Sequence, residues 1–398
     1  MEPEYISKFD EIIEAKDDSQ GCLTFGFELE FLLASVKGDA QDPDPDETRA
    51  LLRISNPYDC DEEVENFIIS ILRQIDGLPV RSERDDDFHP PHDNVPIYDA
   101  WRITHDRSLK KTGRNSHDPY KWQGRELSSV VMSSDDLTYP KQIEDVCRAL
   151  RQARIHLNET TSVHVHVGRG DEPFSLLTIK KFATLYWLTE EKLLALHHPC
   201  RQQSQYSYLL TQMSNLAVDT AADPDPYEWH LDVYGLDKME KFVPSQLPQL
   251  LGVQLRKIWG CYDIEQLARL MRGAQTKTSI PRGAVGFKRF LPAGKSGGNT
   301  QTFEWRQMAG CLDPEHIIQW VRVCVAFTDF ARKSSAEEFN GTLGRILERG
   351  SSYTGFDLLG DLGLHAEAQY FKKRVDGYSR SQEIYEGQEA GNLFVRPL

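Results

Sequence analysis

Length, composition and charge limit what this chain can be. With 398 residues, 39% of them hydrophobic and 27% charged, it has enough apolar material for one large or two average soluble domains. The formal net charge of −15 argues against nucleic-acid binding, which needs a basic surface. Because we find neither a signal peptide nor a run of about 18 apolar residues, we expect a cytoplasmic protein without a membrane partner.

The first predicted element is a strand at TFGFELEFLL (24–33). Alternate side chains of a strand point to opposite faces, so the phenylalanines share one face while Glu28 and Glu30 share the other. Neighbouring carboxylates repel, and removing them from water costs roughly several kcal/mol each unless a cation or donor compensates. Taken alone, the pair would be read as a solvated strand face.

Loops and helices follow this strand. Two Pro- and Asp-rich segments, 37–47 and 81–96, read as surface loops or partly disordered insertions around a helical segment at 62–75. Asp313 suits an N-cap and Pro314 a first helical position. The tail after 333 shows only weak helical signals. Apolar spacing predicts the other helices at 140–158, 175–197, 245–273 and 313–333.

Four later segments, 101–109, 124–132, 161–168 and 299–310, also read as strands with one polar face. If these strands form one curved antiparallel sheet, their polar faces line a single concave surface. The polar residues on these faces are Arg102, Thr104, Asp106, Glu126, Ser128, Ser162, His164, His166, Thr302, Glu304 and Arg306.

Such a surface is unstable unless cations neutralise it. Carboxylates with one imidazole suit Mg²⁺ or Mn²⁺ better than Zn²⁺, and Mg²⁺ commonly shares its coordination with nucleotide phosphates. Arg306 and basic groups from GFKRFLPAGKSGG (286–298), namely Lys288, Arg289 and Lys295, would then contact phosphate, as in phosphoryl transfer from ATP. A rise of about 3.3 Å per residue puts Glu28 and Glu30 about 7 Å apart, so each could bind a different ion.

Simpler roles remain open for several of these residues. Asp106 could form a turn ahead of Ser108, and Arg306 could pair with Glu304. GKSGG lacks the spacing of a phosphate loop and is predicted to be a flexible loop. His197, with His198, His89 and His92, lies in a loop-like context, for which we predict solvent exposure.

The motifs in their order resemble the amidoligase family of the carboxylate–amine ligase group, which is related to γ-glutamylcysteine ligase and glutamine synthetase. The resemblance covers roughly residues 21–332 and rests on FGFELEF, WRITHDRSL, GRELSS, SVHVHVG and TFEWRQMAGCLDPEHIIQWV. It implies an α+β fold like that of glutamine synthetase, a curved antiparallel sheet (half-barrel) with helices on its convex side. It also implies ATP- and Mg²⁺-dependent activation of a carboxylate as an acyl phosphate, which an amine attacks, with release of ADP and phosphate.

The resemblance also implies roles for individual residues. The metal ligands would be Glu28, Glu30, Glu126, Glu304 and one of the two histidines, with His164 slightly preferred over His166. The catalytic residues would be Arg306, Asp106 and Arg289, and the nucleotide-binding residues Arg306, Lys288 and Lys295. The chain would divide into an N-terminal helical segment (1–20), a catalytic domain (21–333) and a C-terminal extension (334–398) packed on it.

Two other classes of protein compete with a ligase. His164, His166 and one carboxylate could bind iron in an oxygenase, although Glu28 and Glu30 would then be unexplained. A degenerate, non-catalytic binding protein of the same fold is disfavoured because every charged position is still a competent ligand. For the ligase, the expected partners are a small-molecule carboxylate and an amine, an amino acid or peptide among them, and no nucleic acid.

Overall fold

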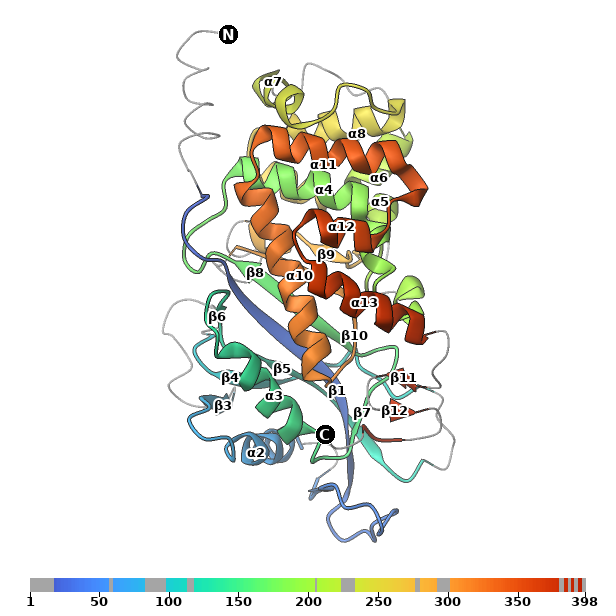
Figure 1. Ribbon diagram of the computed structural model, residues 1–398. Coiled ribbons are helices and arrows are strands. Elements are labelled where there is room, and N and C mark those ends of the chain that lie inside the picture. Colours follow the sequence, from blue (N-terminus) through green and yellow to red (C-terminus); the bar gives the residue numbers. More distant parts are fainter. Residues whose placement is uncertain are drawn as a thin grey trace.

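The computed structural model describes residues 18–56, 60–82, 98–112, 118–204, 206–222, 233–275, 280–291 and 301–378, with 383–385, 388–389 and 393–395. The fold is mixed α+β, as predicted, and is built on an open, mostly antiparallel sheet (Figure 1). In spatial order the strands are β3 (Val80–Ser82), β4 (Trp101–His105), β5 (Lys121–Ser128), β1 (Thr24–Lys37), β8 (Ser162–Gly168), β10 (Thr302–Ala309) and β9 (Val285–Gly286). Shorter strands pair with β1 outside this path, namely β2 (Leu52–Ile54), β6 (Met132–Ser133) and β7 (Ile155–His156). A separate pair is formed by β11 (Glu383–Tyr385) and β12 (Gln388–Glu389).

Strand β1 is the centre of the sheet, with β5 on one side and β8 on the other, both antiparallel. Its Phe25, Phe27, Leu29 and Phe31 are all buried in the main hydrophobic core. The predicted alternation is therefore confirmed, and the strand runs four residues past its predicted end at position 33. The apolar face of β1 joins the sheet to the helices, which leaves its polar face for a site.

The helices on the apolar face of the sheet include α2 (Asp61–Leu72), α3 (Tyr139–Leu150) and α10 (Pro314–Lys333), and their buried side chains belong to the same core. Asp313 caps α10 by accepting a hydrogen bond from Glu315 N, as its sequence predicts. The predicted helix at 140–158 is too long. It ends at Leu150 because residues 155–156 pair with β1 as strand β7.

The helices of the segment between β8 and β10 lie in the upper part of the molecule in Figure 1. Its helices are α4 (Leu176–Leu194), α5 (Leu210–Met213), α6 (Asn215–Ala222), α7 (Val233–Phe242), α8 (Gln249–Trp259) and α9 (Ile264–Met271), with 3₁₀ turns η2 (Pro199–Gln203) and η4 (Lys288–Phe290). Phe182 of α4 stacks on Phe303 of β10 with ring centroids 3.6 Å apart. This stacking fixes α4 against the face of β10 that is opposite to Glu304.

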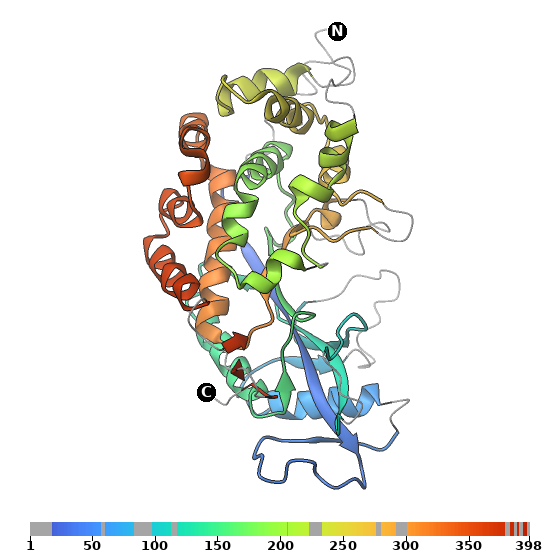
Figure 2. The same cartoon turned by 90° about the vertical axis from the view of Figure 1, so that its right-hand side faces the viewer.

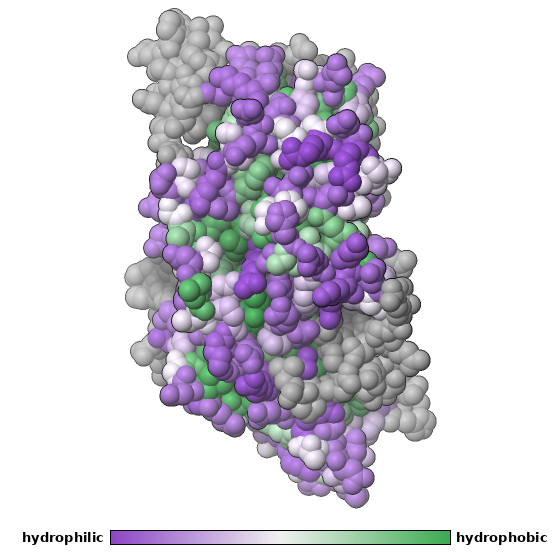
Figure 3. Space-filling model, viewed as in Figure 1, coloured by the Kyte–Doolittle hydropathy of each residue, from purple (hydrophilic) through white to green (hydrophobic). Residues whose placement is uncertain are grey.

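The C-terminal tail is more helical than its sequence pattern predicted. It forms α11 (Ala336–Arg349), η5 (Gly350–Ser352), α12 (Gly355–Asp361) and α13 (His365–Tyr378). These helices lie with α10 along one side of the sheet (Figure 2), and their outer surface in Figure 3 is mostly hydrophilic. Capping boxes begin two of them, Ser335 with Glu338 and Thr354 with Asp357.

The first polar insertion is an ordered loop in this structure. Arg154, which is 1% exposed, forms two hydrogen bonds with the Asp42 carboxylate, at 2.6 and 2.7 Å, and also donates to backbone carbonyls of the loop. Most of the second insertion and residues 1–17 lie outside the described residues. In the parts of the chain that are described, no helix is both long and apolar enough to cross a membrane.

Candidate active site

Backbone pairing places the polar residues in rows across one face of the sheet, because directly opposed residues of antiparallel strands point the same way. One row contains Arg102, Ser128, Glu28 and His164, each opposite the next. The row on one side pairs Thr104 with Glu126 and Glu126 with Glu30. The row on the other side runs through Gly26, His166, Glu304 and Gly286. The polar side chains of these rows come from five strands, so a two-residue period brings distant segments of the sequence together.

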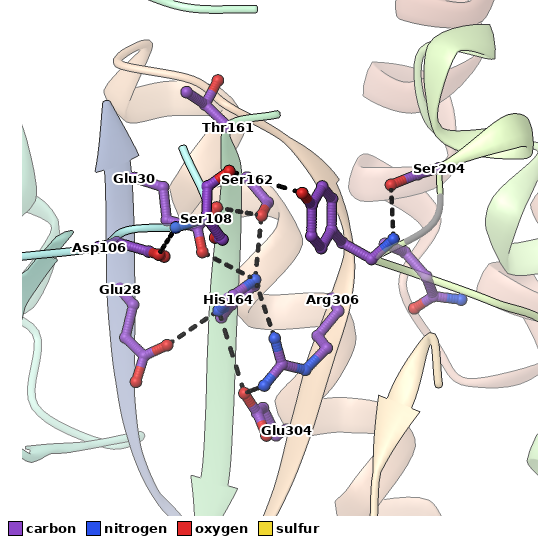
Figure 4. Close-up of polar contacts among 12 residues, drawn as sticks. Glu28, Glu30, Asp106, Ser108, Thr161, Ser162, His164, Ser204, Glu304 and Arg306 are labelled. Atoms are coloured by element: carbon purple, nitrogen blue, oxygen red, sulfur yellow. Dashed lines mark hydrogen bonds and ion pairs between the residues drawn. The ribbon is translucent and has the colours of Figure 1, made fainter. Parts of the chain in front are cut away.

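His164 is the centre of this face (Figure 4). Its Nδ1 lies 2.9 Å from Glu28 Oε2 and 4.0 Å from Glu304 Oε1. On the other side of the ring, Nε2 lies 3.0 Å from Ser162 Oγ and 3.5 Å from Glu30 Oε1. Ser162 in turn donates to the Glu30 carboxylate. One buried imidazole therefore has acidic groups at both of its nitrogens.

Arg306 reaches the same centre from β10. Its guanidinium pairs with Glu304, and its Nη1 lies 3.4 Å from His164 Nε2 (Figure 4). The predicted pairing of Arg306 with Glu304 is therefore confirmed, while the contact with His164 keeps the guanidinium at the site. Both charged side chains are largely buried.

These side chains line a cavity of about 200 Å³. Its lining residues are Glu28, Glu126, His164, His166, Arg282, Lys288, Arg289, Glu304 and Arg306. A second, less polar cavity of about 470 Å³ adjoins it and shares Glu28, His166 and Arg289. Tyr98, whose hydroxyl lies 3.2 Å from Arg289 Nη2, and Val131 also line this larger space. The site is thus a small charged chamber next to a roomier pocket.

Burial and mutual charge shift the carboxyl groups in opposite directions. Burial raises the pKa of Glu126 well above its usual range, and Glu28 and Glu30 raise it further. Burial also raises the pKa of Glu30. In Glu28 the effect of burial is outweighed by His166 and His164, which hold the pKa of that carboxyl well below its usual range. In Glu304 it is outweighed by Arg306, so that this pKa is lowered.

The basic residues from 286–298 are only partly accounted for. Lys288 and Arg289, from turn η4, line the charged cavity, whereas Lys295 and the GKSGG segment lie outside the described residues. Asp106 follows β4 and forms the alternative turn, its Oδ1 accepting a hydrogen bond from Ser108 N at 2.7 Å. A catalytic role for Asp106 stays a prediction.

The prediction that His197 is solvent-exposed is wrong. The ring is 2% exposed and packs edge-on against Trp320, with centroids 4.2 Å apart. Burial lowers the pKa of His197 to about 3, with nearby Arg201 acting in the same direction. His198 is partly buried, and His89 and His92 lie outside the described residues.

The structure places three residues at the site that the sequence did not assign to it. Ser162 lies on the predicted polar strand face, two positions before His164, and that periodicity is a signal that could have identified it. Arg282 and Tyr98 come from irregular segments just before strands β9 and β4, respectively. No periodic signal in the sequence could have found these two.

The donor set fits a divalent cation. Among the described residues, two groups of three have donor atoms within 4.8 Å of one another: Glu28, His164 and Glu304, and Glu30, Glu126 and His164. Each group offers two carboxylates and one imidazole, the donor chemistry of Mg²⁺ or Mn²⁺. The two groups share His164, and neither of them includes His166.

The fold and site thus define an α+β protein with a carboxylate-lined chamber on its central sheet. The chain belongs to the family described as "Putative amidoligase enzyme", whose model matches residues 22–224. The match includes β1, β5 and β8 and ends before Glu304 and Arg306. No curated protein matched the chain. Family membership supports an enzyme with a ligase-type function.

Proposed function

We propose that this protein is an ATP- and Mg²⁺-dependent carboxylate–amine ligase with a fold like that of glutamine synthetase. The observation that supports this most is that the two groups bring four carboxylates around one imidazole. A neutral imidazole has one lone-pair nitrogen, so His164 would bind one cation, and the carboxylates would bind that cation and a second one beside it. Metal bound there would neutralise the phosphate oxygens of ATP and polarise the γ-phosphoryl group. The family match supports amide-bond formation as the reaction class.

The residues of the charged chamber divide into two roles under this proposal. Glu28, Glu30, Glu126, His164 and Glu304 would hold the cations. Arg306, Arg282, Lys288 and Arg289 line the same chamber and would contact phosphate oxygens, since planar guanidinium groups match phosphate geometry. Arg306 is the best placed to stabilise developing charge, because the Glu304 pair and His164 hold it at the centre.

The reaction would occur in two steps. The substrate carboxylate attacks the γ-phosphorus of ATP, which forms an acyl phosphate and releases ADP. The amine then attacks the acyl carbon, the C–O bond to phosphate breaks, and the amine nitrogen loses a proton as the amide forms. The larger adjoining cavity, which shares Glu28 and Arg289 with the chamber, has room for a small-molecule substrate.

The competing functions explain less of the geometry. An iron oxygenase needs two histidines and one carboxylate on one ion, whereas each donor group found among the described residues has one histidine and two carboxylates. A non-catalytic binding protein would have no need for a buried arginine at the centre of the donor groups. We therefore expect small-molecule partners and a cytoplasmic location, as the composition suggests.

Product analysis tests the proposal. Purified protein is incubated with ATP, Mg²⁺ and mixtures of carboxylic acids and amines, and nucleotides are separated chromatographically while mass spectrometry searches for new amides. We expect ADP, phosphate and an amide, and no turnover in the Glu28→Gln variant. AMP and pyrophosphate would instead indicate adenylation of the carboxylate, and a product that forms without ATP would contradict the proposal.

A further inference from the structure

Arg306 lies at an irregularity in β10. Trp305 is opposite Val165 of β8, and the next paired residue, Met308, is opposite Val163. In the backbone pairing, Arg306 and Gln307 are therefore both opposite the single residue His164. This pairing of two residues with one is a β-bulge. Bulges interrupt the ladder of backbone hydrogen bonds and change the direction of a side chain, so the carbonyls at this point need other donors.

Arg201 supplies those donors from outside the sheet. It belongs to turn η2 and is 1% exposed. Its Nη2 donates to the Arg306 carbonyl at 2.7 Å, and its Nε donates to the Gln307 carbonyl at 3.3 Å. A planar guanidinium can reach both carbonyls of the bulge at once, which a lysine ammonium on a flexible stem does not reproduce.

The peptide of Arg306 is also held from the other side. Arg306 N donates to the Ala284 carbonyl at 2.9 Å, and Ala284 N donates to the Tyr208 carbonyl at 2.7 Å. The backbone at Arg306 is thus bonded through both its N–H and its carbonyl. Burying a guanidinium is costly unless its donors are used, and two of those of Arg201 are used on the bulge.

We propose that Arg201 is a positioning residue that fixes the β10 bulge and so directs the Arg306 guanidinium toward His164. The proposal rests on the proposed function for the role of Arg306, whereas the position of Arg306 can be tested without it. Arg201 itself does not line the charged chamber. It would act through the backbone of Arg306.

A double-mutant cycle tests the proposal. Calorimetry measures the dissociation constant of Mg²⁺–ATP for wild type, Arg201→Lys, Arg306→Lys and the double variant. Arg201→Lys alone should weaken binding by about tenfold, and in the Arg306→Lys background by less than about twofold, because the two residues act as one unit. A purely structural role would instead give additive effects.

Arg154→Lys is the matched control. Arg154 is equally buried and also donates to backbone carbonyls, of Arg49 and Glu47, but it holds the first polar insertion (37–47) instead of the site. This variant should lower the melting temperature and leave the Mg²⁺–ATP dissociation constant within about twofold. If Arg201→Lys does not fold, Arg201→Gln, which keeps an N–H donor without a buried charge, replaces it.

A crystal structure of the Arg201→Lys variant gives an independent readout. The proposal predicts that the Arg306 guanidinium leaves the position in which its Nη1 is 3.4 Å from His164 Nε2. An unmoved guanidinium, or additive binding effects, would overturn the proposal. Wild type that fails to bind Mg²⁺–ATP would contradict the proposed function alone, and the displaced or unmoved guanidinium would still decide the role of Arg201.

Discussion

Replacing single glutamates of the charged chamber by glutamine should change the stability of the metal-free protein in opposite directions. The amide keeps the shape of the side chain and removes its charge. Glu28 is ionised and contacts two imidazoles, at 2.9 Å from His164 Nδ1 and 3.2 Å from His166 Nε2. For Glu126, burial and the charges of Glu28 and Glu30 instead raise the pKa and so favour the neutral carboxyl group. We therefore expect Glu28→Gln to destabilise the metal-free protein and Glu126→Gln to stabilise it.

The geometry sets the size of both effects. A glutamine at position 28 can accept a bond from one imidazole but not from both, so at least one hydrogen bond to a charged group is lost, about 2 kcal/mol. Donor oxygens of Glu30 and Glu126 lie within 4.8 Å of each other. At an effective dielectric constant of about 20, their repulsion when both are ionised is about 3.5 kcal/mol. Proton uptake already relieves part of this repulsion, so Glu126→Gln should raise the free energy of unfolding by only about 1 kcal/mol.

Thermal unfolding at pH 7.5 in excess chelator measures both changes. The unfolding entropy of a 398-residue chain is about 0.84 kcal/mol/K, so 1 kcal/mol shifts the melting temperature by about 1.2 °C. Glu28→Gln should therefore melt about 2 °C below wild type and Glu126→Gln about 1 °C above it. Glu191→Gln, which alters an exposed acid on α4, is the control and should melt with wild type. A stabilised Glu28→Gln or a destabilised Glu126→Gln would refute the electrostatic reasoning.

Three further changes probe other parts of the site and core. Arg306→Lys keeps the charge but not the planar fork, so turnover should fall by roughly 10²–10³ while Mg²⁺–ATP still binds, about tenfold more weakly than to wild type, as steady-state kinetics with calorimetry would show. Gly286→Ala would put a Cβ 3.0 Å from Glu304 Oε2, so Mg²⁺–ATP should raise its melting temperature less than that of wild type. Because the folded pKa of His197 is about 3, below the unfolded 6.5, the unfolded state binds the proton first and stability falls as the pH drops below 6.5. Urea unfolding measures the free energy of unfolding of wild type and His197→Phe at pH 7 and at pH 5. Between these pH values the variant should lose about 2 kcal/mol less than wild type. An equal loss in both proteins would show that His197 does not titrate in this way.

Sequence periodicity predicted the part of the site that a strand determines locally. The alternation in β1 and β8 correctly placed Glu28, Glu30 and His164 on polar faces opposite the buried phenylalanines and valines. Periodicity of two says which face a residue occupies, and antiparallel pairing then brings those faces together. The amidoligase family followed from the same strand motifs.

Other features depend on contacts between segments far apart in the chain. Arg201 reaches the bulge of β10 only in the folded protein, and nothing near it in the sequence indicates that it donates to the carbonyls of residues 306 and 307. His197 reads as a loop residue until Trp320 packs on it. The C-terminal helices, by contrast, had a local signal, since Ser335 and Glu338 form a recognisable capping box.

The central claim is that the acidic face of the sheet binds divalent metal at the groups sharing His164. Crystals grown with Mn²⁺ and a non-hydrolysable ATP analogue, measured at the manganese absorption edge, test it most directly. We predict anomalous peaks beside Glu28, His164 and Glu304 and beside Glu30 and Glu126, with the analogue's phosphates against Arg306. Manganese found only at surface acids, with the chamber empty of metal and nucleotide, would contradict the account.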